Sequence, residues 1–140
     1  MRLSRDTRYG LEALAVLARR PVGEVVEARE LADEAGLPSP YLAKIMQALA
    51  RGGVLDSFRG RGYALPRPPE EVLLRDVIRA IDGDDAFWDG CIFWREECSE
   101  TDPCPLHFRW RELKPEFAQV MGSITLADIP VRGAARLFGS

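Results

Sequence analysis

The chain of 140 residues contains only three cysteines and one histidine, and no apolar run approaches the roughly 20 residues that span a bilayer. Three is an odd number of cysteines, which argues against a disulfide framework. The first ten residues, MRLSRDTRYG, lack the hydrophobic core of a signal peptide. These absences predict a cytoplasmic protein with reduced thiols and no membrane partner.

The sequence also lacks a strong excess of positive charge, since its formal net charge is −3. This balance argues against a basic protein that coats nucleic acid without specificity. Residues 1–66 hold 10 basic against 8 acidic side chains, whereas residues 67–140 hold 9 against 14. A mildly basic front half suits a protein that contacts DNA through one small surface. No nucleophile–base pair or phosphate-binding loop is present in the sequence, so we do not expect an enzyme.

The clearest pattern is a pair of short helices, one over residues 28–35 and one over residues 40–51 with Ser39 as its N-cap. Gly36 is suited to end the first helix, and Ser39 followed by Pro40 is suited to cap and begin the second. The second helix has an apolar face with helical spacing, made of Leu42, Ile45, Met46 and Leu49. This spacing predicts a helix-turn-helix, with residues 40–51 as the recognition helix.

The opposite face of the recognition helix has small, hydrogen-bonding and basic side chains but no acid: Ser39, Ala43, Lys44, Gln47, Ala48 and Arg51. Lysine and arginine reach DNA phosphates, and serine and glutamine reach base edges. A hairpin is expected next, with strands at 54–58 and 63–65 and the turn Arg59-Gly60-Arg61-Gly62. Arginine in such a turn can enter a minor groove, so the hairpin is expected to act as a wing.

Further helices are expected on both sides of this unit. Ser4 can cap a helix over residues 5–20, and a helix over residues 70–82 follows the stiff linker of residues 66–69 and ends at Gly83. Arginines 2, 5 and 8 crowd the start of the first helix. Either solvation or phosphate contact explains that crowding, and Arg2 is kept as a candidate DNA contact.

The C-terminal half has an irregular segment over residues 84–105 and then an apolar seam with three-four spacing: Leu106, Trp110, Leu113, Phe117 and Val120. Such a seam suits a partner helix, and Pro115 predicts a kink or a late start of the helix. A dimer through this helix would place two recognition helices about 34 Å apart on a near-palindromic site. Residues 130–140 are expected to form a flexible tail.

The three cysteines lie in or beside the irregular segment, as Cys91, Cys98 and Cys104 with the spacing C-x6-C-x5-C, and His107 follows. Thiolates and imidazole bind iron–sulfur clusters or zinc, and four such side chains can complete one site. Zinc usually prefers closer C-x2-C pairs, so the wide spacing favours a cluster. The alternative is three buried cysteines and one surface histidine. The polar surroundings argue against simple burial. His107 is the weakest ligand candidate, and taken alone it is expected to be an incidental surface residue rather than a ligand.

Several motifs, in this order, resemble the Rrf2 family of transcription regulators. They are MRLS, ELADEAGLPSPYLAKIMQALARGGVL, RGRGYAL, the three cysteines with C-x2-H, and ITLADI. The resemblance covers about residues 1–129. It implies a homodimeric winged-helix regulator that binds an iron–sulfur cluster. In such proteins the state of the cluster tunes DNA binding in response to cluster supply, redox stress or nitric oxide.

The resemblance also implies a ligand set. Cys91, Cys98 and Cys104 match the three thiolates of the family's cluster. His107 matches the fourth ligand of the IscR type, which has a 2Fe–2S cluster. The NsrR type, with a 4Fe–4S cluster, uses an acidic residue near the N-terminus, and the comparable residue here is Arg8, which cannot bind iron. The resemblance therefore favours 2Fe–2S and leaves 4Fe–4S possible.

On the DNA side, Arg59 matches the family's wing arginine, and Tyr41 and Lys44 lie on its recognition helix. The wing is shorter than in many members, and Ala43 replaces a glutamate that IscR uses to discriminate sites, so the operator cannot be transferred. The candidate DNA contacts are Arg2, Ser39, Tyr41, Lys44, Gln47, Arg51, Arg59, Gly60 and Arg61.

The whole sequence predicts a mainly α protein with a small β-hairpin wing. Residues 1–66 are expected to form a winged helix-turn-helix domain, and residues 67–129 a linker helix, a cysteine loop and a long dimerisation helix. The predicted function is a homodimeric transcription regulator whose operator binding depends on an iron–sulfur cluster. Two alternatives stay open: a zinc-containing or metal-free winged-helix regulator that senses a small metabolite, and a protein-interaction module without a DNA role.

Overall fold

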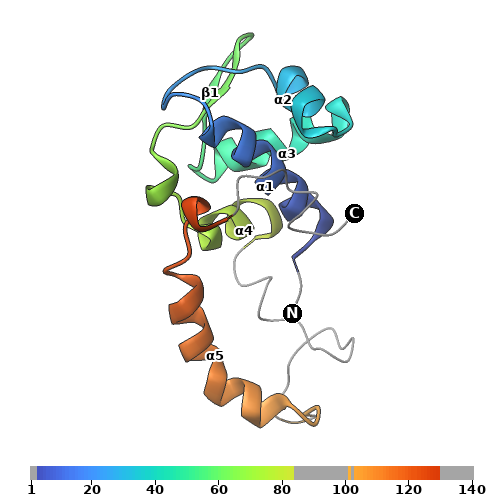
Figure 1. Cartoon of the computed structure of the whole chain (residues 1–140). Helices are drawn as coiled ribbons and strands as arrows, with labels where there is room; N and C mark the ends of the chain where they lie inside the picture. The colour runs from blue at the N-terminus through green and yellow to red at the C-terminus, as the bar shows by residue number, and fades with distance from the viewer. Residues whose placement is uncertain (1–2, 84–100, 102, 130–140) are drawn as a thin grey trace.

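The computed structural model describes residues 3–83, 101 and 103–129, which form a mainly helical fold with one β-hairpin (Figure 1). This is the fold class that the sequence predicts. The elements in chain order are α1 (Arg5–Ala18), α2 (Ala28–Ala35), α3 (Ser39–Arg51), β1 (Asp56–Phe58), β2 (Gly62–Ala64), the 3-10 turn η1 (Pro69–Glu71), α4 (Leu74–Asp82), α5 (His107–Met121) and the 3-10 turn η2 (Leu126–Asp128).

A single apolar core joins α1, α2, α3 and α4. It includes Leu11 and Leu14 of α1, Leu31 of α2, Leu42 of α3 and Val77 of α4, all almost fully buried. The residues with the predicted helical spacing in α3 are its buried face. Burial of such side chains is the main stabilising term, at roughly 1.5–3 kcal/mol each.

The helix-turn-helix has the predicted shape, with one difference at its second start. Gly36 ends α2 in the left-handed conformation, with φ of 71°. The helix α3 begins at Ser39 itself, so the prediction of Ser39 as the N-cap is wrong by one residue. Pro38 takes the cap position, because its extended backbone presents its carbonyl oxygen to the Leu42 N–H at 3.0 Å.

The start of α1 is joined to the end of α4. As predicted, Ser4 caps α1, and its Oγ accepts a hydrogen bond from the Thr7 N–H at 3.0 Å. The Ser4 and Thr7 hydroxyls also donate to the Asp82 carboxylate, at 2.7 and 2.8 Å. One carboxylate at the end of α4 therefore fixes the first turn of α1.

The predicted bounds of α1 and α4 are too long. α1 ends at Ala18 rather than at Arg20, because Pro21 disfavours helical geometry in the residue that precedes it. α4 begins at Leu74 rather than at residue 70. The Val72 carbonyl accepts from the Leu126 N–H at 2.8 Å, and the Leu74 N–H donates to the Ile124 carbonyl at 3.0 Å. This pairing keeps residues 72–73 extended, and neighbouring sequence cannot predict it.

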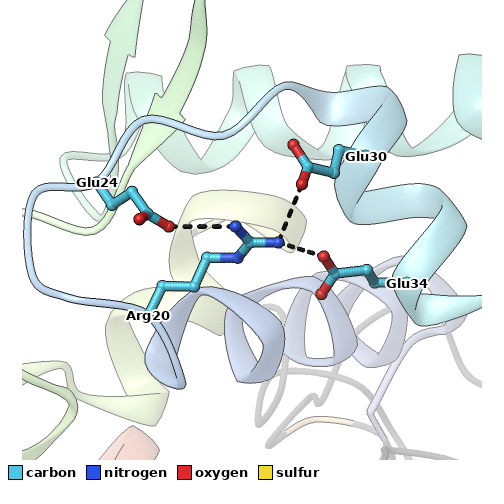
Figure 2. A network of polar contacts seen from close by, with 4 residues as sticks. All are labelled: Arg20, Glu24, Glu30 and Glu34. Carbon is cyan, nitrogen blue, oxygen red and sulfur yellow. Dashed lines mark hydrogen bonds and ion pairs between the residues drawn. The ribbon is translucent and has the colours of Figure 1, made fainter.

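Arg20, just after α1, pairs with three glutamates: Glu24 in the segment that follows, and Glu30 and Glu34 in α2 (Figure 2). Its guanidinium donates to Glu24 at 3.1 Å, to Glu30 at 3.2 Å and to Glu34. The hydrogen bond to Glu24 is the largest cause of a raised Arg20 pKa, to which Glu34 and Glu30 also contribute, while burial lowers it. These ion pairs join α2 to the segment that follows α1.

The helix α5 extends away from the other helices (Figure 1). Its C-terminal end is anchored, since Met121 is part of the core and Phe117 packs against it. Pro115 lies inside the helix, which begins at His107, so of the two predicted consequences, a kink or a late start, the late start is wrong. None of the described helices is long and apolar enough to cross a membrane.

Candidate nucleic-acid interface and cysteine–histidine turn

The exposed face of α3 is basic and polar. Lys44, Gln47 and Arg51 are exposed, whereas Ser39 is half-buried at the first turn. The buried leucine and methionine side chains on the other face fix the helix against the core. The four residues thus lie on the side of α3 that the sequence predicts for DNA.

Tyr41 is the candidate contact that the structure places differently from the others. It is half-buried, and its hydroxyl hydrogen-bonds with the Asp6 carboxylate of α1. The Arg5 guanidinium lies over its ring at 5.2 Å from the centroid, and the ring of Tyr9 meets it edge-on at 5.6 Å. Tyr41 therefore connects the start of α3 to the start of α1, whatever it contributes to DNA binding.

The wing is an antiparallel hairpin in which Asp56 pairs with Ala64, Ser57 with Tyr63 and Phe58 with Gly62. The predicted strands at 54–58 and 63–65 are wrong at their ends, because Val54 and Leu55 turn into the core and Gly62 joins the second strand. The turn residues Arg59, Gly60 and Arg61 are exposed, as predicted. Their main chain is held by the Arg61 N–H, which donates to the Phe58 carbonyl at 2.9 Å.

The segment between α1 and α2 holds the wing in place. Val26 and Tyr63 exchange two backbone hydrogen bonds, both at 2.9 Å. Gly62 lies so close to this segment that a Cβ atom there would be 2.2 Å from the Val26 carbonyl oxygen. The wing and the start of α2 therefore form one connected unit.

A groove of about 490 Å³ lies between the wing, the start of α2 and the exposed face of α3. Gln47, Arg59, Gly60 and Arg61 line it, so the structure brings four of the predicted DNA contacts together. Arg29 lines it as well and was missed in the sequence. Arg29 lies far from the wing in the chain, and only the Val26–Tyr63 pairing brings the two together. The sequence offered one signal for Arg29: it is a basic residue in the first turn of α2, the first helix of the helix-turn-helix.

Cys104 and His107 occupy one turn at the start of α5. Both are buried, at 9% and 5% exposure, and the His107 N–H donates to the Cys104 carbonyl at 3.0 Å. The His107 ring also contacts Phe108 edge-on at 5.0 Å. The prediction that His107 taken alone is a surface residue is wrong. A buried thiol and a buried imidazole in one turn form a donor pair that fits a metal or a cluster.

The remaining predicted ligands, Cys91 and Cys98, lie outside the described residues, and so does Arg2. Within the described ranges, no group of three or more histidine, cysteine or acidic side chains is arranged to bind a metal ion. Arg8 has the position of the alternative ligand near the N-terminus, and Asp6, two residues before it, accepts a hydrogen bond from the Tyr41 hydroxyl.

The chain matches the Rrf2 family, described as iron-dependent transcriptional regulators, over residues 3–131. A relative from Aquifex aeolicus (strain VF5), named as an HTH-type transcriptional regulator, is 33% identical over 133 residues that cover 92% of this chain and 91% of the relative. The structure is similar to that of CymR, the global cysteine regulator of B. subtilis, with a TM-score of 0.69, 26% identity, and coverage of 91% and 94%. It is also similar to T. potens IscR, with a TM-score of 0.65, 28% identity, and coverage of 91% and 85%.

These relatives are transcription regulators and not enzymes, and the family match spans nearly the whole chain. The winged helix-turn-helix, the basic face of α3 and the arginines of the wing agree with that match. The chain therefore belongs to the Rrf2 family and is a DNA-binding transcriptional regulator.

Proposed function

We propose that this regulator acts in the cytoplasm as a homodimer and that an iron–sulfur cluster controls its binding to a near-palindromic operator. Cys91, Cys98, Cys104 and His107 would hold the cluster, with 2Fe–2S favoured. The observation that supports this most directly is the buried pair of Cys104 and His107 in the turn that begins α5. When bound, the cluster supplies a centre that responds to oxidants.

The DNA face of the proposal consists of α3 and the wing. Lys44, Gln47 and Arg51 would enter or border the major groove, and Ser39 would contact the DNA at the first turn of α3. Arg59, Gly60 and Arg61 would meet the DNA beside this groove. Arg59 would enter the adjacent minor groove, since a narrow groove attracts arginine, and Gly60 would leave room for the backbone to approach a sugar–phosphate strand. Tyr41 would act near this face through its contacts with α1, and Arg2 stays a further prediction.

The homodimer is supported by the exposed seam of α5. Leu106, Leu113 and Val120 lie seven residues apart and are 44%, 54% and 54% exposed in the single chain. Trp110 and Phe117, which alternate with them, have ring centroids 5.7 Å apart. An apolar stripe of this kind on a helix that extends from the core suits pairing with a second copy.

The position of Cys104 and His107 suggests how the two parts communicate. Both belong to the turn that starts the proposed dimer helix, and the other end of that helix is anchored in the core by Met121. A change in what Cys104 and His107 bind would alter the start of α5. The relative position of two recognition helices would change with it.

An anaerobic absorption spectrum, with quantitation of iron, sulfide and zinc, tests the cluster. We expect iron and sulfide with visible absorption in the wild type, and loss of that absorption in Cys104→Ala. Glu116→Ala is the control, since Glu116 is exposed on α5 and follows His107 by nine residues, so this variant should keep the spectrum. A colourless, iron-free wild type whose DNA affinity ignores oxidants would contradict the proposal. Zinc without iron would favour the alternative metal.

A further inference from the structure

The groove between the wing and the start of α2 contains one cation, Arg29, that the proposed function does not use, beside two arginines that it does use. Arg29 lines it from α2, and Arg59 and Arg61 line it from the wing. All three are exposed, and among the described residues no ion pair to any of them is observed. Arg20, by contrast, is matched by three glutamates (Figure 2). Glu27 is the one acidic side chain among the residues that line the groove.

The positions of these arginines are fixed by the backbone. Val26 and Tyr63 exchange two hydrogen bonds, Arg29 follows Val26 by three residues, and Arg61 precedes Tyr63 by two. The Arg61 guanidinium lies over the Phe58 ring at 5.9 Å from its centroid, which restrains the side chain. The two walls of the groove are therefore held at a set spacing before any ligand binds.

The lining favours a polyanion over a small molecule. Small-molecule sites of about 300–1,000 Å³ are lined mostly by apolar side chains with a few polar groups. Here three arginines, Gln47 and Ser57 are among the lining residues. Guanidinium groups pair with phosphate oxygens through two parallel hydrogen bonds. The groove also opens beside the exposed face of α3, where the duplex would lie.

We infer that this groove binds one sugar–phosphate strand of the duplex, and that Arg29 and Arg61 contact its phosphates from the two sides. The inference rests on the proposed function, in which α3 and the wing face DNA. It assigns different roles to the three arginines. Arg59, in the turn, reads the minor groove, whereas Arg29 and Arg61 fix the position of the protein along the backbone without reading bases.

Binding measurements on the full chain test this division. The probes are a duplex that the wild-type protein selects from a random library and an unrelated duplex of the same length, each titrated over a range of salt concentrations. We expect Arg29→Ala and Arg61→Ala to weaken binding to both duplexes by the same factor. The slope of log affinity against log salt should fall by about 0.9 for each phosphate that the variant no longer neutralises.

Three further variants make the result specific. Arg29→Lys should keep the wild-type slope, because an ammonium group still contacts a phosphate. Arg59→Ala should reduce the preference for the selected duplex. Arg79→Ala removes an exposed arginine of α4 that does not line the groove, and should change neither quantity. The unfolding midpoint of each variant reports that it is folded.

The outcomes separate this inference from the proposed function. If Arg29→Ala binds both duplexes with wild-type affinity and slope while Arg59→Ala binds weakly, the groove does not hold a DNA strand and the inference is wrong. If Arg29→Ala loses only its preference for the selected duplex, Arg29 reads bases, and the inference is also wrong. If the wild type selects no duplex at all, the proposed DNA face itself fails.

Discussion

Gly62 shows at the scale of one residue how the wing depends on backbone approach. Its φ is +131°, and a Cβ atom would meet the carbonyl oxygen and carbon of Val26 at 2.2 and 2.6 Å. Main-chain atoms cannot move away as a flexible side chain can. The pairing of Val26 with Tyr63, which joins the wing to the start of α2, is therefore possible only with glycine at this position.

Gly62→Ala is expected to destabilise the protein by at least about 2 kcal/mol, through both the positive φ and the backbone contact. Denaturant unfolding measures this cost. Gly60→Ala is the matched control, because Gly60 has a φ of +73° in the same turn but a Cβ atom added there would meet nothing within 4 Å. It should cost only about 1–2 kcal/mol. Equal destabilisation in the two variants would mean that the Val26 contact is unimportant.

Residues whose role is local could be predicted from the sequence. Ser4 as the cap of α1 and Gly36 as the end of α2 depend on neighbours in the chain, and both predictions are confirmed. Arg29 and Tyr41 depend on distant partners. The first joins the wing only through the Val26–Tyr63 pairing, and the second is held by Asp6, so their surroundings were not predictable from spacing.

At the scale of elements, the existence of each helix followed from apolar periodicity, whereas some ends did not. α2 has its predicted bounds because Gly36 supplies a local stop. The start of α4 depends on hydrogen bonds with residues 124 and 126, which are 50 and 54 positions from their partners Leu74 and Val72 in the chain. The proposed cluster site shows the same limit: the sequence predicted the candidate ligand types, and the structure adds that Cys104 and His107 are buried in one turn.

The exposed seam of α5 leads to a prediction about assembly. Leu113 is 54% exposed and lies at the centre of the stripe, so Leu113→Glu should leave the single chain folded but place an unpaired charge in the proposed interface. We expect the dimer dissociation constant to rise more than about tenfold, which corresponds to 1.4 kcal/mol. Light scattering after size-exclusion chromatography measures the mass. Gln119→Glu adds the same charge on the exposed opposite side of α5 and should leave the mass unchanged.

A wild-type protein that is monomeric at all concentrations would contradict the role of the seam. A dimer that survives Leu113→Glu would place the interface elsewhere. DNA affinity should fall together with dimerisation, because two linked recognition helices bind two half-sites with a high effective concentration.

At the scale of the whole molecule, hydrogen bonds join the wing, the helical core and the segment that follows α5. The wing is paired to the segment before α2, the start of α1 is bound to Asp82 at the end of α4, and Leu74 is bonded to Ile124 beyond α5. These contacts come from parts of the chain that are far apart in sequence. They suggest that the DNA face and the anchored end of α5 move as one body.

This connection predicts how the dimer responds to the spacing of its half-sites. Recognition helices fixed about 34 Å apart match half-sites one helical turn apart, and five inserted base pairs turn one half-site to the opposite side of the duplex. We expect that insertion to reduce affinity to that of a single half-site. Ten inserted base pairs should not restore it, since the half-sites then face the same way but lie a further turn apart. The same base pairs added outside the site are the control.

If ten inserted base pairs restore the affinity, the connection between the two subunits is flexible. If neither insertion changes the affinity, one subunit binds DNA alone.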